Sequence, residues 1–365
     1  MIVITHWIGF FLGIMIVVST IGSIIDTLIV TRSVESRITL VSWEITRYIF
    51  KLLSYRTTLY EKKDRLLSFR GPASLLTTLG LWIVLFVIGY ALMFWPFTEG
   101  NFATALKLSG SSFFTLGVVS SPDGGPTVLE FAAAATGMIT IALQIGYLPT
   151  LYSSYNKREA LVTALSIRVR RIAWGPNILK HHYKENEMST MPTLFAAWEI
   201  WAADITESHV SHPWLMVFRS PHRMNSWVTT LLSVIDAAAL YLILNPSQAP
   251  AEARQCLRAG ITCFQTISDS MGFTDEVSRA NSPQEATLSY EEFLYGLQYL
   301  ETSGFPIEIS KEEAWQQFRA MRAKYERSAY ELADFAFAVP APWSGMRDKM
   351  TPETILPTIP LPNKI

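Results

Sequence analysis

Residues 115–119 read Thr-Leu-Gly-Val-Val, an uncharged stretch whose backbone carbonyls are suited to binding a cation. Apolar residues recur with helical spacing over 101–114, and a Pro-Asp-Gly-Gly-Pro turn follows at 122–126. The stretch 99–130 is too apolar for an ordinary loop, and its helical part, 101–114, is too short for a further span, so it predicts a re-entrant pore loop. Non-helical backbone at membrane depth is tolerated where it lines water, and carbonyls that face permeant ions meet that condition.

A second group of residues that could take part in chemistry is the histidine cluster His209, His212 and His222, with Asp204 and Glu207 nearby in the sequence. Such a group suits a metal or a pH sensor. The alternative is that these histidines are polar residues at helix ends. The sequence contains no G-x-G-x-x-G, no phosphate-binding loop and no H-E-x-x-H. We therefore expect no enzyme activity, no cofactor and no nucleic-acid partner.

Long uncharged runs are the elements that must position the predicted loop. Half of the 365 residues are hydrophobic and 17% are charged, against about 25% charged in ordinary soluble chains. The uncharged runs cover 1–25, 71–98 and 131–156, and each exceeds the roughly 20 residues that span a bilayer. The first run lacks the basic start and the A-x-A site of a signal peptide, so it is predicted to be an anchor. The fold class is therefore an all-α membrane protein with three transmembrane helices and a re-entrant pore helix.

Basic residues predict the orientation in the membrane. The segment 32–70 carries nine basic and four acidic residues, and the segment after 157 opens with five basic residues. The stretch 99–130 holds a single basic residue, Lys107. The N-terminus and 99–130 are accordingly predicted outside, and 32–70 and the C-terminal part in the cytoplasm, in a plasma membrane. A helix over 38–53 with a broad apolar face either lies on anionic lipid or packs against the cytoplasmic domain.

The arrangement of span, pore helix, Thr-x-Gly and second span resembles the two-transmembrane pore-loop potassium channels. The resemblance covers about 71–157 and is carried by 112–117 and by the glycine-containing tract 137–148. The family filter reads Thr-Val-Gly-Tyr-Gly. This sequence matches it at Thr115, Leu116 and Gly117 and departs from it at Val118, Val119 and Ser120. A β-branched residue rarely reaches the positive φ that glycine adopts, so only the rows from Thr115 to Gly117 are expected to keep the filter geometry.

The resemblance also implies partners and gating positions. One pore loop per chain implies a homotetramer that conducts a monovalent cation such as potassium, since four loops are needed for one ring of carbonyls. Asp123 is then an acid at the outer mouth; the alternative, which the sequence favours, is a turn residue before Gly124. Gly137 and Gly146 are candidate hinges and Pro149 a candidate kink; close helix packing is the alternative role for the glycines.

The remainder of the chain predicts a helical cytoplasmic domain. The expected domains are 1–31, 32–70, 71–156, 157–339 and a proline-rich tail 340–365. Helices are expected at 157–173, 193–208, 212–218, 227–244, 251–271, 289–302 and 311–337. The apolar segment 227–244 is either a buried core helix or a fourth span interrupted by Asp236.

Three functions follow from these features. The leading one is a tetrameric cation channel whose helical domain serves assembly or gating. The alternative is a non-conducting, channel-like membrane scaffold or sensor, which Val119 favours. A membrane enzyme that uses the histidine cluster is the third and least supported function.

Overall fold

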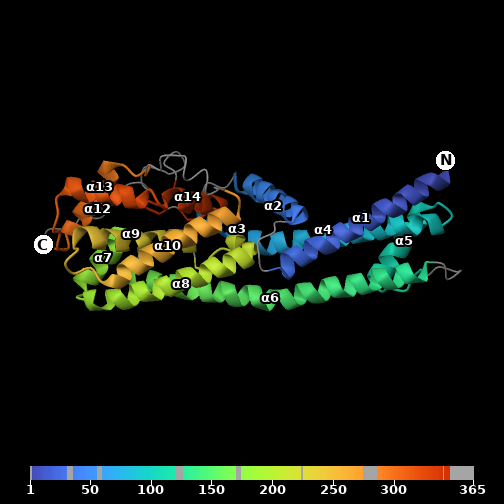
Figure 1. Ribbon diagram of the computed structural model, residues 1–365, viewed down its shortest axis with the longest axis horizontal. Helices are drawn as coiled ribbons and strands as arrows, with labels where there is room; N and C mark the ends of the chain where they lie inside the picture. The colour runs from blue at the N-terminus through green and yellow to red at the C-terminus, as the bar shows by residue number, and fades with distance from the viewer. Residues whose placement is uncertain are drawn as a thin grey trace. The chain divides into compact units, whose positions relative to one another are not determined.

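The computed structural model describes residues 2–30, 36–55, 60–119, 126–169, 174–222, 225–273, 286–339 and 341–345 (Figure 1). Throughout these residues the chain is helical, and no strand is present in them. The contacts divide the chain into two compact units, Met1–Ser153 and Ser154–Ile365. The first unit contains α1 (Ile2–Leu28), α2 (Arg37–Tyr55), α3 (Tyr60–Leu67), α4 (Arg70–Phe94), η1 (Trp95–Phe97) and α5 (Phe102–Phe113). The helix α6 (Thr127–Val169) begins in the first unit and continues into the second.

In the first unit, α1 and α4 pack along small residues. A Cβ added at Gly13 would lie 2.5 Å from the carbonyl oxygen of Gly89, and one at Gly89 would lie 2.8 Å from Val17 Cγ2. Glycine therefore lets the two backbones come close, and dispersion contacts replace the hydrophobic effect that is missing between helices in lipid. Ser23 of α1 accepts a hydrogen bond at 3.0 Å from the indole of Trp82 on α4. The pair is thereby held in register by packing and by a polar contact.

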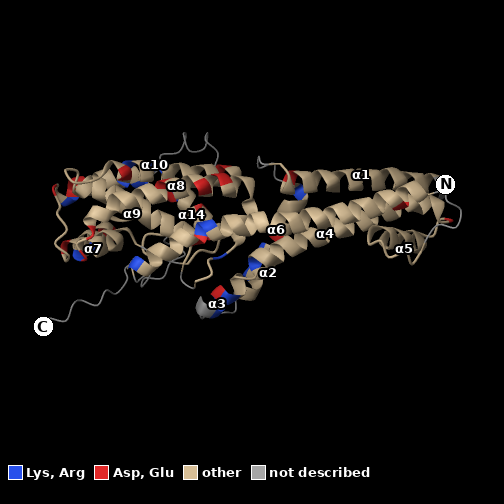
Figure 2. Cartoon of the chain, turned by 90° about the horizontal axis from the view of Figure 1, so that it is seen from below, with Lys and Arg blue, Asp and Glu red and all other residues tan. Residues whose placement is uncertain are grey.

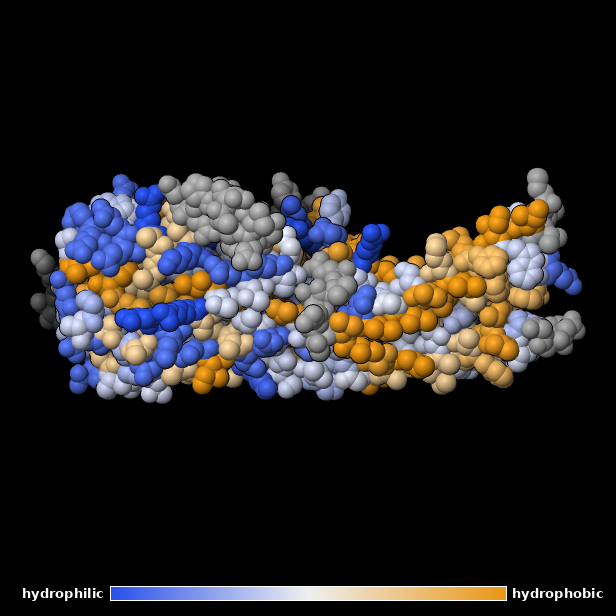
Figure 3. Space-filling model, in the orientation of Figure 1, coloured by the Kyte–Doolittle hydropathy of each residue, from blue (hydrophilic) through white to orange (hydrophobic). Residues whose placement is uncertain are grey.

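The outward surface of this unit is apolar. Ile4, Ile8, Phe11, Met15 and Val18 of α1 follow each other at helical spacing and are all exposed. Charged side chains are scarce along α1, α4 and α5 (Figure 2), and apolar side chains cover much of the surface of the first unit (Figure 3). Three stretches of this part, Ile4–Leu28, Lys62–Phe97 and Thr127–Val169, are long and apolar enough to cross a membrane. The expectation of several apolar spanning-length helices in an all-helical chain is therefore confirmed.

Helix α2 buries small hydroxyl side chains and exposes an apolar sector. Its buried side includes Ser42 and Thr46, which bond to Thr78 and Ser74 of α4 at 2.6 and 3.0 Å. Its exposed side carries an apolar sector of Val41, Ile45, Tyr48, Ile49 and Leu52. Small polar residues thus join α2 to α4, and an apolar sector of α2 points away from the protein, although Trp43 and Phe50 of the same helix are buried.

The second unit is built around α9 (Trp227–Leu244). The surrounding elements are α7 (Gly175–Lys184), η2 (Met188–Thr190), α8 (Met191–Ser211), η3 (Pro213–Val217), α10 (Ala251–Ser270), α12 (Tyr290–Glu301), α13 (Lys311–Arg322) and α14 (Glu326–Phe335). Helices α7, α8, α10, α13 and α14 all contact α9. Although α9 is long and apolar enough to cross a membrane, 94% of its apolar window is buried inside the unit. This burial favours the core-helix interpretation over a fourth span.

Asp236 lies in the middle of α9 and is compensated by an ion cluster. Arg322 forms ion pairs with both Asp236 and Glu326, and Tyr325 donates a 2.7 Å hydrogen bond to Asp236. Burial opposes the ionisation of Glu326, but Arg322 and hydrogen bonds from Thr287 outweigh it and lower the pKa of that carboxyl. The cluster lets one acid sit at the centre of an apolar helix.

Several predicted helix boundaries need correction. The predicted break before 157 is wrong, because α6 runs continuously through Pro149 to Val169. Helix α7 was not predicted; it opens at the Gly175-Pro176 pair, since proline at the first turn lacks only an N–H that has no partner there anyway. The predicted helix 311–337 is two helices, which are separated at Ala323–Tyr325. The predicted helix 212–218 is a short 3-10 helix, η3.

Candidate pore loop

Helix α5 is the predicted pore helix, and two features position it. Asn101 caps its N-terminus by accepting hydrogen bonds from the backbone amides of Ala103 and Thr104 at 3.0 and 3.3 Å. On the side facing α4, Ser109 donates a 2.7 Å hydrogen bond to the carbonyl of Val87, and the rings of Phe113 and Phe86 lie 5.7 Å apart. The helix is therefore held against α4 along its length.

The C-terminal end of α5 rests on α6 at Gly137. A Cβ at this glycine would lie 2.1 Å from the carbonyl oxygen of Phe113, so no larger residue fits without displacing one helix. Nearby, the hydroxyls of Tyr90 and Thr136 are 2.8 Å apart and join α4 to α6. Of the two hinge candidates, Gly137 is thus a packing residue. Gly146 has open space where a Cβ would be.

Thr115 ends α5 in a Schellman arrangement. The amide of Leu116 donates to the carbonyl of Ser111 at 2.8 Å, and the amide of Thr115 donates to that of Ser112 at 3.0 Å. Thr115 has a φ of +54°, which is uncommon for a β-branched residue because its Cβ crowds the backbone. This position is usually glycine, so the threonine is held there at a cost in backbone strain.

The backbone handedness alternates along the predicted filter. Thr115 and Gly117 have φ values of +54° and +65°, and Leu116 and Val118 between and after them do not have positive φ. Alternation of this kind turns successive carbonyls toward one side. It covers Thr115 to Val118 and stops at Val119, which also has no positive φ.

Ser111 closes the loop back onto α5. Its hydroxyl donates to the carbonyl of Val119 at 3.1 Å and accepts from the amide of Val119 at the same distance. The Val119 carbonyl is therefore engaged within its own chain. Sequence reasoning missed Ser111, although a serine one turn before the end of the predicted pore helix was available as a signal.

The loop side chains are uncovered in the single chain. Leu116 and Val118 are 64% and 78% exposed, and Phe114 is also exposed. The third apolar helix is similarly uncovered, because only 17% of the apolar window of α6 is buried. Gln144 is buried, and Pro149 lies inside α6 without ending it. Asp123 and Ser120 lie outside the described residues.

The members of the predicted histidine group differ in their surroundings. His209 is fully enclosed, with Nδ1 3.0 Å from the Ile205 carbonyl and Nε2 3.3 Å from Arg158 Nη1, whereas His222 is exposed. Burial first, and then the charge of Arg158, lower the pKa of His209 well below its ordinary value. Among the described residues, no group of three His, Cys, Asp or Glu side chains is arranged to hold a metal. Arg158, which sequence reasoning did not single out, is the buried cation that organises this region.

Arg158 is bound on all sides by the second unit. It donates to the carbonyls of Leu215 and Phe218 at 2.7 Å each and pairs with Glu159 at 2.7 Å. The thiols of Cys256 and Cys263 are buried, and burial raises the pKa of the Cys263 thiol to about 12. Both cysteines are therefore unreactive core residues.

Comparison with known proteins adds one relative. The chain is 26% identical over 200 residues to the uncharacterized membrane protein YdjJ of Bacillus subtilis (strain 168), a match covering 50% of this chain and 57% of that protein. The chain thus spans little more than half the length of the curated relative that it matches. No protein-family model matches, and no solved structure matches. The apolar helices, together with this similarity, indicate an all-helical membrane protein.

Proposed function

We propose that this chain is one subunit of a homotetrameric cation channel with three membrane spans. The spans are α1, α4 with η1, and α6, and α5 with residues 114–119 forms the re-entrant pore loop. The observation that carries the proposal is the alternating handedness from Thr115 to Val118, at the end of a short helix that is seated on both other apolar helices. A filter needs such alternation because each ring of carbonyls must face the same axis.

Exposed apolar surface supports the tetramer. The uncovered side chains of the loop and the largely unburied α6 leave more apolar area than one chain can hide. In a ring of four chains, α6 lines the pore and meets its neighbours, and the loops surround one axis. The second unit then serves assembly or gating, because α6 continues directly into it.

The distribution of basic residues supports the orientation. Nine basic residues between the first two spans and five soon after the third favour the cytoplasmic side for 32–70 and for the second unit. The N-terminus and the pore loop then face the outside of the plasma membrane. Helix α2 fits this placement as an interfacial helix: its apolar sector enters the inner leaflet and Arg37, Arg47 and Lys51 meet anionic headgroups.

The permeant ion is a monovalent cation, with potassium the first to test. Rows of carbonyls from Thr115 to Gly117 are available, whereas the Val119 carbonyl accepts a bond from Ser111. We therefore expect fewer ion-binding rings of carbonyls than in the filter of the potassium channels that the chain resembles. We also expect weaker discrimination between potassium and sodium.

Reversal-potential measurement in mixed sodium and potassium, on purified protein in planar bilayers, tests this function. We expect cation current that Gly117→Val abolishes, since valine disfavours the φ of +65°. Gly110→Ala is the matched control, because a Cβ at Gly110, within α5, meets nothing. Current that persists unchanged in Gly117→Val contradicts the pore assignment.

The second candidate is a non-conducting membrane scaffold or sensor with the same body. The clamp of Ser111 on Val119 favours it, because a loop closed on its own helix does not require an ion. Cation flux into liposomes separates the two functions. Absence of flux in the wild-type protein and in Ser111→Ala, at several pH values, supports the scaffold and opposes the channel.

A further inference from the structure

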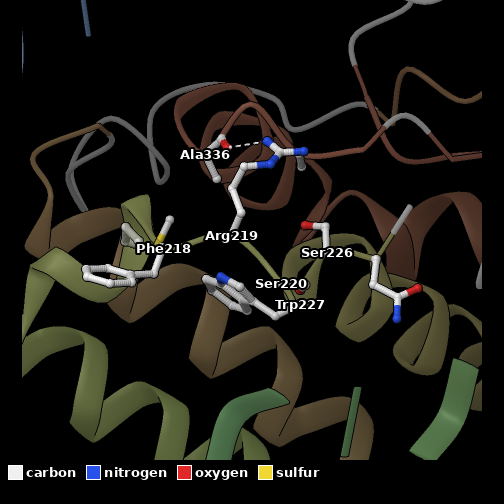
Figure 4. A pocket seen from close by; sticks show the side chains of 9 residues that line it. Phe218, Arg219, Ser220, Ser226, Trp227 and Ala336 are labelled. Atoms are coloured by element: carbon white, nitrogen blue, oxygen red, sulfur yellow. Dashed lines mark hydrogen bonds between the residues drawn. The ribbon is translucent and has the colours of Figure 1, made fainter. Parts of the chain in front are cut away.

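A small pocket lies within the second unit where α9 begins (Figure 4). It is lined by the chain around Arg219 and Ser220, by Ser226 and Trp227 at the start of α9, and by Ala336 at the end of α14. It is partly open, and its enclosed part holds about one water-sized group. None of its lining residues is acidic.

The start of α9 supplies buried donors without a cap. Trp227, Val228 and Thr229 form the first helical turn and are buried, and the preceding Ser226 makes no side-chain capping bond. The first amides of a helix have no acceptor within the helix, and a buried helix end without partners is costly. The helix dipole adds a partial positive charge at the same point.

Two side-chain donors at the pocket also lack partners. The indole Nε1 of Trp227 and the hydroxyl of Ser220 are buried and make no hydrogen bond. Trp227 is only 2% exposed, and its nitrogen lies on the ring edge that is turned toward the chain at Phe218 and Arg219 (Figure 4). An indole N–H can only donate, so only an acceptor satisfies it.

The surrounding charge is positive. Arg219 reaches over the pocket toward the Ala336 carbonyl, to which it donates at 3.5 Å (Figure 4). It also donates to the Phe337 carbonyl at 2.5 Å. The guanidinium carbon of Arg158 lies 5.8 Å from the Trp227 ring centre, although Glu159 pairs with that arginine. Donors converge here with cations around them and with no carboxylate in the lining.

We propose that this pocket binds an oxyanion of the phosphate class, with one oxygen inside and the rest of the anion at the opening. The size of the enclosed part fits one oxygen atom, and the Trp227 indole, the Ser220 hydroxyl and the first amides of α9 are its donors. The site lies against the cytoplasmic part of α6. Tyr155 donates to the Arg219 carbonyl at 3.0 Å, and Arg158 donates to the Phe218 carbonyl. Binding is independent of whether the chain conducts ions.

Calorimetric titration of the full-length protein in detergent with inorganic phosphate, at constant ionic strength, tests the site. Saturable binding is expected, weakened about tenfold by Trp227→Phe, which removes one donor and keeps a ring of similar shape. Ser220→Ala should weaken binding by a smaller factor. Trp174→Phe is the matched control and should bind like the wild type, because its indole N–H is equally buried and unpartnered but does not line the pocket.

Each outcome bears on the proposal. Weaker phosphate binding in both pocket variants, with helix content retained by circular dichroism, supports it. If wild-type protein takes up no phosphate, or Trp227→Phe and Ser220→Ala both bind it as well as Trp174→Phe does, the pocket is not an oxyanion site. Equal binding of chloride at the same ionic strength also overturns the assignment to the phosphate class.

Discussion

Helices α6 and α9 are similarly apolar and are used in opposite ways. Both are long and apolar enough to cross a membrane, yet 17% of the apolar window of α6 is buried and 94% of that of α9. Around α6 the contacts are made through a glycine and a pair of hydroxyls. Around α9 they are made by five helices and a buried ion cluster.

The difference shows how the surroundings of a helix determine whether its polar or its apolar side chains face other helices. In the first unit, small polar residues such as Ser42 and Thr78 face another helix and apolar side chains face outward. Lipid tails solvate apolar side chains, so no hydrophobic force drives them inward, and polar groups find partners only within the protein. In the second unit the apolar side chains of α9 are enclosed by other helices, as the hydrophobic effect favours.

Removing Arg322 should have the largest effect and should act on the second unit alone. Arg322→Met leaves Asp236 and Glu326 in the core without a cation, which typically costs about 3–5 kcal/mol. Thermal denaturation followed by circular dichroism should show a large fall in the transition of this unit. Arg327→Met is the control, since its pair with Glu331 is half-exposed and is expected to contribute under about 1 kcal/mol. Equal effects of the two variants would contradict a buried ion cluster.

Enlarging Gly13 should destabilise the first unit without affecting the second. Gly13→Leu places a side chain 2.5 Å from the Gly89 carbonyl, and overpacking of this kind costs about 1–3 kcal/mol. Unfolding in mixed micelles should report the loss. Gly22→Leu, on the same helix where a Cβ meets nothing, should be nearly neutral. A neutral Gly13→Leu would show that α1 and α4 do not pack through this glycine.

Acidic pH should weaken the second unit through His209. The folded-state pKa of this histidine is lowered by burial, so the unfolded chain binds more protons below pH 6.5. Stability should therefore be complete above pH 6.5 and should fall as the pH drops, by up to about 1.4 kcal/mol per pH unit. His182 and His212 shift in the same direction and add to the slope. Chemical denaturation at pH 7.5 and 5.5 should show a smaller pH dependence in His209→Gln than in His222→Gln.

Removing one hydroxyl between α2 and α4 should have the smallest effect. Thr78→Val keeps the shape of the side chain and removes the 2.6 Å hydrogen bond to Ser42. Interhelical hydrogen bonds in membranes average about 0.6 kcal/mol, because the separated helices find other partners. A loss of more than about 2 kcal/mol in the free energy of unfolding in micelles would contradict this expectation. It would mean that the hydroxyl contacts of α2 stabilise the first unit as much as the packing of α1 on α4 at Gly13 does.

Much of the helical framework could be predicted from the sequence. A helix was expected over 101–114 and is observed as α5, Phe102–Phe113, and the expected helix 227–244 coincides with α9. Local signals determine such elements, since Asn101 is a helix cap and Asn245-Pro246 ends a helix. The break before 157 was mispredicted because the change from apolar to charged composition at Lys157 marks a change of surroundings and not of backbone.

The candidate site was only partly predictable. The segment 115–119 was singled out as a predicted filter by its Thr-x-Gly pattern. The hydrogen bonds from Ser111 to Val119 and the contact of Phe113 with Gly137 join residues whose contact depends on how helices pack. The histidine group looked promising in sequence because His209 and His212 are three residues apart. In the structure, His209 is instead buried in the core, where it contacts Arg158.

By itself, the sequence determined that this protein is helical, that three uncharged runs are long enough to span a bilayer, and that a glycine-containing loop lies between two of them. Those properties follow from composition and local spacing, which act within one helix. Only the tertiary structure decided that α9 is enclosed around an Asp236–Arg322 pair and that α2 turns its apolar side outward. It alone also placed the uncapped start of α9 beside an unpartnered indole. Side-chain burial and ion pairing depend on which residues far apart in the sequence come into contact. Hydropathy along the chain does not contain that information.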